Sequence, residues 1–161
     1  MIMQRTSLLF VSVLALLSFQ NCGSDTIELP ENDLEGKIGG TNWTYGGANA
    51  FRRTTGGQYE VKFISNAEAP ANPCGLPSPG LAHVKAVFTP SFGSFTVSPQ
   101  AIDGNQVQVI FQVSNAQAVT ANSGFMEVFD ITGGTVFGYL QASEDVNNTF
   151  VEGRVEIVLC D

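Results

Sequence analysis

The sequence is short of positive charge and of histidine. It has 7 Lys and Arg residues against 15 Asp and Glu residues, for a formal net charge of −8, and one histidine. An acidic chain with no basic cluster repels phosphate backbones, so we expect no nucleic-acid partner. A Ser-His-Asp hydrolase needs a histidine base. The only candidate, His83, shares the strand phase of Lys85 opposite Val84, so we expect it to face water.

Metal ligands are also scarce. A structural zinc site takes four Cys or His ligands and a catalytic one usually takes three protein ligands. One histidine and two cysteines that we expect to be joined to each other do not supply them. For calcium, the "SEDVNNT" stretch groups oxygen-bearing side chains but lacks the glycine and distant glutamate of an EF-hand loop. The oxygen-bearing residues of this stretch are Glu144, Asp145, Asn147 and Thr149. We interpret the stretch as a hairpin tip, and we expect the protein to bind no cofactor.

No hydrophobic run is long enough to cross a bilayer. The stretch 8–17 is apolar except for Ser12, whereas a spanning helix needs about 20 residues. The preceding residues 1–7 carry one positive charge, Arg5, and no acid. This layout predicts a secretory signal peptide over residues 1–21.

The signal lacks the Ala-x-Ala cleavage site of ordinary secretory signals and ends instead in Phe19-Gln20-Asn21-Cys22. This ending resembles the lipobox of bacterial lipoproteins. The resemblance implies that Cys22 becomes the first mature residue and is acylated, which attaches the protein to the membrane of a bacterial cell envelope. Gly23, rather than an aspartate, follows the cysteine, and this favours the outer membrane. The alternative is an ordinary thiol at Cys22.

The cysteine count agrees with lipidation. An oxidising compartment discourages a leftover thiol, and acylation of Cys22 leaves Cys74 and Cys160 to form one disulfide. After the signal, residues 22–35 hold five acids, one proline and no basic residue, which is typical of an extended tether. Residues 36–161 are about the usual size of a single domain.

Alternating polar and apolar residues and recurrent Gly, Asn and Pro turns predict an all-β domain. The clearest alternation places Val151, Val155 and Ile157 opposite Glu152 and Glu156. In that phase Cys160 points away from the core, so its disulfide would pin the 67–81 connection over the outer face or end of the sheet. We expect strands over residues 36–40, 42–53, 58–63, 83–89, 94–98, 106–113, 123–132, 134–143 and 149–160.

Two architectures fit eight or nine sequential strands: an antiparallel β-sandwich, which we expect first, and an up-and-down barrel of the lipocalin sort. The opening Gly36, Ile38, Gly40 and Trp43, with a closing strand that ends in Cys160, resembles small all-β bacterial lipoprotein domains. That resemblance implies a fold and no activity.

Candidate binding residues come from aromatic and acidic positions. Trp43 and Tyr45, two apart, form either an aromatic platform on one strand face or part of the core. Glu127 shares a phase with Phe129, where an unpaired charge is costly to bury. It is either an edge residue or a partner of Arg52 or Arg53, or else a polar group in a ligand pocket. If the fold is a barrel, its cavity would be lined by Phe125, Phe129, Phe137 and Tyr139.

We therefore expect a lipid-anchored, non-enzymatic envelope protein with a structural or binding role, whose partner is a protein, a glycan or a small apolar ligand. The second hypothesis is a small-molecule or lipid carrier with a barrel cavity. The third is a glycan-acting enzyme that uses Glu127 and Asp130 as paired carboxylates.

Overall fold

The computed structural model describes residues 31–52, 57–68, 72–75, 80–100 and 104–160. The signal peptide expected over residues 1–21 and the lipidation site expected at Cys22 lie outside these residues. Only the end of the expected tether is described, and it already belongs to the fold. Leu34 is fully buried in the core, and Asp33 forms a β-bridge with Arg154.

The all-β fold predicted from the sequence is confirmed. Each of the nine expected strands is present to within a few residues at its ends, and one short strand, β7, escaped prediction. The ten described strands are β1 (Glu35–Ile38), β2 (Thr41–Arg52), β3 (Tyr59–Ser65), β4 (His83–Phe88), β5 (Gly93–Val97), β6 (Gln106–Ser114), β7 (Gln117–Thr120), β8 (Ser123–Thr132), β9 (Thr135–Glu144) and β10 (Thr149–Cys160). Two single-turn 3₁₀ helices, η1 (Asn66–Glu68) and η2 (Pro73–Gly75), lie between β3 and β4.

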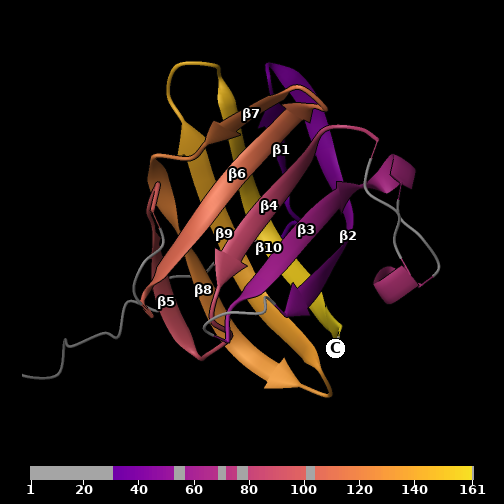
Figure 1. Ribbon diagram of the computed structural model, residues 1–161, viewed down its shortest axis with the longest axis vertical. Helices are drawn as coiled ribbons and strands as arrows, with labels where there is room; N and C mark the ends of the chain where they lie inside the picture. Colours follow the sequence, from indigo (N-terminus) through magenta and orange to yellow (C-terminus); the bar gives the residue numbers. More distant parts are fainter. Residues whose placement is uncertain (1–30, 53–56, 69–71, 76–79, 101–103, 161) are drawn as a thin grey trace, which may run out of the picture.

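The strands form one mostly antiparallel sheet in the order β4-β3-β2-β1-β10-β9-β8-β5-β6-β7. Because β4 also pairs with β6, the sheet closes roughly into a barrel-like ring, with β7 outside it. In Figure 1, β6, β4, β3 and β2 lie in front of β8, β9 and β10, so the ring is flattened into two facing layers. Of the two expected architectures, the structure is therefore closer to the barrel than to the β-sandwich that we expected first. The order of its strands differs from that of a simple up-and-down barrel.

The core lies inside the ring and is built by side-chain alternation. In β10 every second residue from Val151 to Ile157 is buried, while Glu152, Arg154 and Glu156 are exposed. In β6, Val107, Val109 and Phe111 are likewise buried. Side chains from nine of the ten described strands meet in one apolar cluster. The predicted alternation of both strands is confirmed.

The disulfide expected between Cys74 and Cys160 is present, with 5.6 Å between the two Cα atoms. Cys160 is only 4% exposed yet is not part of the core cluster, which fits its outward phase in β10. It is covered because η2, which carries Cys74, packs against β2 and β10. In the same connection Glu68 of η1 accepts hydrogen bonds from the backbone N–H groups of Gly80 and Leu81 at 2.9 Å.

Breaking the disulfide should destabilise the fold strongly. The bond joins residues 86 positions apart, and the chain-entropy model gives such a cross-link up to about 4 to 5 kcal/mol. Cys74 is exposed, so Cys74→Ser removes the bond without creating a cavity. We expect urea unfolding of this variant at a lower midpoint, equal to that of the wild type in reductant. An unchanged midpoint would contradict a stabilising role for the bond.

Gly124 in β8 should tolerate no side chain. Its φ of +126° lies in the region that favours glycine, and a Cβ atom there would collide with the backbone carbonyl of Gln141. We expect Gly124→Ala to lower the free energy of unfolding by at least about 2 kcal/mol. The matched control is Gly47→Ala in β2, where no atom lies within 4 Å of the added carbon. Equal stabilities of the two variants would contradict the prediction.

Candidate functional site

The structure separates the five candidate binding residues. Tyr45 and Phe129 line one cleft. Glu127 and Tyr139 lie directly opposite each other in neighbouring strands, outside that cleft. Trp43 is 5% exposed and belongs to the core, where its indole N–H donates to the carbonyl of Ala82 at 3.0 Å. Its position therefore matches core packing rather than a surface platform.

The aromatic residues proposed as a barrel lining do gather, but on the outer face of the sheet. In β8 and β9 the side chains that enter the core belong to the opposite phase; they are Met126, Val128, Val136 and Leu140. Phe129 is 48% exposed, and Phe125 and Phe137 are half-buried. The ring interior beside these strands is thus packed with aliphatic side chains, and the aromatic rings face outward.

On part of this outer face, a ring stack and a hydrogen bond link two aromatic side chains to a carboxylate. The rings of Phe125 and Tyr139 stack with their centroids 5.7 Å apart, and the Tyr139 hydroxyl donates to Oε1 of Glu152. Burial raises the pKa of Tyr139, and the hydrogen bond and charge of Glu152 add to this rise, so the hydroxyl keeps its proton.

Glu127 is not an edge residue. It belongs to β8, which pairs with β5 on one side and with β9 on the other.

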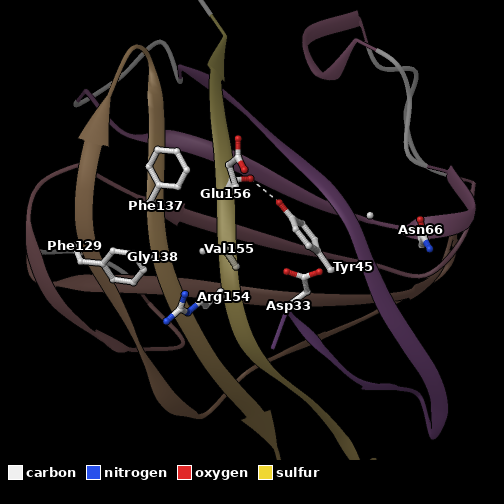
Figure 2. Close-up of a pocket in the computed structure, with 10 residues that line it drawn as sticks. Asp33, Tyr45, Asn66, Phe129, Phe137, Gly138, Arg154, Val155 and Glu156 are labelled. Carbon is white, nitrogen blue, oxygen red and sulfur yellow. Dashed lines mark hydrogen bonds between the residues drawn. The ribbon is translucent and has the colours of Figure 1, made fainter. Parts of the chain in front are cut away.

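The cleft that contains Tyr45 and Phe129 has a volume of about 560 Å³. Figure 2 shows Phe129 and Phe137 on one side, Tyr45 and Asp33 on the other, and the β10 segment Arg154–Glu156 between them. Gly46, Asn66 and Gly138 complete the lining. The cleft therefore combines aromatic rings with charged groups of both signs.

The cleft lies where β10 changes partner along one edge. Up to Arg154 the backbone of β10 bonds to β1 and the residues just before it, and from Val158 it pairs with β2. Between these ladders, the Tyr45 hydroxyl donates to the backbone carbonyl of Glu156 at 2.5 Å. A side chain thus supplies the donor that a missing strand residue would have provided.

Irregular pairing shapes both walls of the cleft. The β8–β9 register shifts between Val128 and Asp130, so Phe129 is an extra residue in β8. The β2–β3 register shifts between Tyr45 and Gly47, and a Cβ atom on the intervening Gly46 would collide with the backbone of Asn66. Bulges re-aim side chains and are frequent beside functional sites.

Burial raises the pKa of the Tyr45 phenol, and the nearby charges of Glu156 and Asp33 raise it further. The hydroxyl therefore remains a hydrogen-bond donor at physiological pH. The side chains of Asp33, Arg154 and Glu156 form no hydrogen bond or ion pair with other residues that the structure describes. These three charged groups are available to a ligand.

The expectation that His83 faces water is wrong. It has the outward phase of β4, yet it is only 5% exposed. Its Nδ1 lies 3.0 Å from the carbonyl oxygen of Leu81, in the connection that joins β3 to β4. Burial lowers the pKa of His83, and the charges of Lys85 and Lys62 lower it further, so the imidazole is neutral at pH 7.

Among the residues that the structure describes, no three His, Cys, Asp or Glu side chains gather as a metal site. In the "SEDVNNT" hairpin, Glu144 instead accepts hydrogen bonds from the N–H groups of Val146 and Asn147 and from the Asn147 amide. Although desolvation opposes them, these bonds lower the pKa of Glu144. Asp130, one of the two proposed catalytic carboxylates, accepts a hydrogen bond from the Thr132 hydroxyl at 2.8 Å.

Comparisons with protein-family models, with curated proteins and with solved structures find no match to this chain. Within the described ranges, no helix has both the length and the apolar character needed to span a bilayer.

Tyr45→Phe should destabilise the edge where β10 changes partner. The substitution keeps the ring and removes the donor to the Glu156 carbonyl, and loss of such an exposed hydrogen bond costs about 0.5 to 1 kcal/mol. We expect a lower midpoint of urea unfolding at pH 7. The matched control is Tyr59→Phe, because the half-buried Tyr59 hydroxyl bonds to no described residue. If both variants unfold like the wild type, the Tyr45 bond adds no stability.

Proposed function

We propose that this chain is a non-enzymatic, lipid-anchored binding protein of a bacterial cell envelope, held at the outer membrane through acyl chains on Cys22. The lipobox-like context of Cys22, the acidic tether and the glycine at position 23 support the anchor. Attachment that lasts takes two or more acyl chains, since a single chain binds a bilayer only marginally.

The cleft beside β10 is the observation that carries the binding role. It brings two exposed or half-exposed aromatic rings together with three charged side chains that have no described partner. Binding sites typically combine apolar walls with a few convergent polar groups. Two β-bulges and a tyrosine hydroxyl maintain this arrangement.

A binding role is preferred to catalysis because of what the candidate catalytic groups do. The single histidine is buried, with Nδ1 against the Leu81 carbonyl. The carboxylates of Glu127 and Asp130 do not line the cleft. The carrier function, our second hypothesis from the sequence, is not proposed, since the four aromatic residues that would line its cavity lie on the outer face of the ring.

Metabolic labelling with an alkyne fatty acid tests the anchor. The wild-type protein should incorporate the label and remain in the membrane fraction. Cys22→Ala should lose the label because it has no acceptor thiol. Cys74→Ser is the control for a cysteine change elsewhere and should keep the label. Label that persists in Cys22→Ala would refute the anchor.

A further inference from the structure

We infer that the cleft beside β10 binds an uncharged oligosaccharide. This inference rests on the proposed binding function and names the chemical class of the ligand. The aromatic wall would pack against the C–H face of a sugar ring, and the charged side chains would bind its hydroxyl groups.

The aromatic wall suits a sugar face. Phe129 is 48% exposed and is the extra residue of the bulge in β8, and Phe137 lies beside it on β9. Figure 2 shows both rings on the same side of the cleft. Exposed rings of this kind offer flat apolar area with a partly negative face, against which polarised C–H groups pack well.

The charged side chains of the cleft can form hydrogen bonds with the hydroxyl groups of a sugar. The carboxylates of Asp33 and Glu156 only accept hydrogen bonds and the guanidinium of Arg154 only donates them, whereas a hydroxyl group does both. A pair of neighbouring hydroxyls can therefore bond to a carboxylate and to the guanidinium together. None of these three side chains has a described partner that a ligand would need to displace.

Other ligand classes fit the cleft less well. A lipid tail would strip water from three charged side chains without replacing their hydrogen bonds, which is costly. A polyanion would meet two carboxylates in a chain of net charge −8. An added peptide strand needs unpaired backbone groups, but the Glu156 carbonyl is already bonded to Tyr45. A basic peptide is the remaining competitor, and the experiment includes one.

The test is calorimetric titration of the full-length protein in mild detergent with four probes. Two are uncharged, cellotetraose and N-acetylated chitotetraose; the others are tetragalacturonate and tetralysine. At least one uncharged probe should bind, more tightly than either charged probe. Phe129→Ala and Arg154→Gln should each weaken that binding roughly three- to tenfold. Phe92→Ala is the matched control, because Phe92 is 67% exposed and lies outside the cleft.

Thermal midpoints of the variants, compared with that of the wild type, distinguish a lost contact from a lost fold. The inference is overturned if neither uncharged probe binds, if tetralysine binds more tightly than both, or if Phe129→Ala and Arg154→Gln bind like the wild type. The fatty-acid label on Cys22 is measured on the same preparations. A labelled protein that binds no oligosaccharide would reject the ligand class while the anchor stands.

Discussion

The backbone hydrogen bonding of β10 is the constraint on which the other features depend. This strand contributes Val151, Val155 and Ile157 to the core, so its backbone groups need partners on both edges. β9 supplies one edge throughout, but on the other edge short β1 ends before β2 arrives. The Tyr45 hydroxyl bridges the interval by bonding to the Glu156 carbonyl. Tyr45 and Glu156 both line the cleft, so the cleft lies at the interval between the two ladders.

Local sequence patterns were sufficient to predict the strands. Alternation in β3, β6 and β10 gave both the strand positions and the buried phase, because one side of each strand is clearly polar. The short strand β7 escaped because Gln117–Thr120 is too brief and too exposed to show a pattern. The disulfide followed from cysteine counting alone, without any knowledge of where η2 packs. The choice between sandwich and barrel depended on the β4–β6 pairing, which skips over β5 and therefore leaves no hairpin pattern in the sequence.

The candidate site was harder to predict. Both phases of β8 and β9 are apolar, so the sequence could not show that Phe129 and Phe137 face outward while Met126 and Val128 fill the core. The charged half of the cleft joins Asp33 to residues more than a hundred positions later, and no local pattern connects them. His83 shows the complementary error, since its outward phase was correct, but the β3–β4 connection removes it from solvent.

The entry of the chain into the fold has a spatial consequence. Asp33, at the start of the sheet, is itself part of the cleft wall. It lies eleven residue steps from Cys22, and a fully extended chain of that length spans at most about 40 Å. If Cys22 is anchored as proposed, the tether would hold this wall of the cleft within that distance of the bilayer. Molecules attached to the envelope surface would then lie within reach of the cleft.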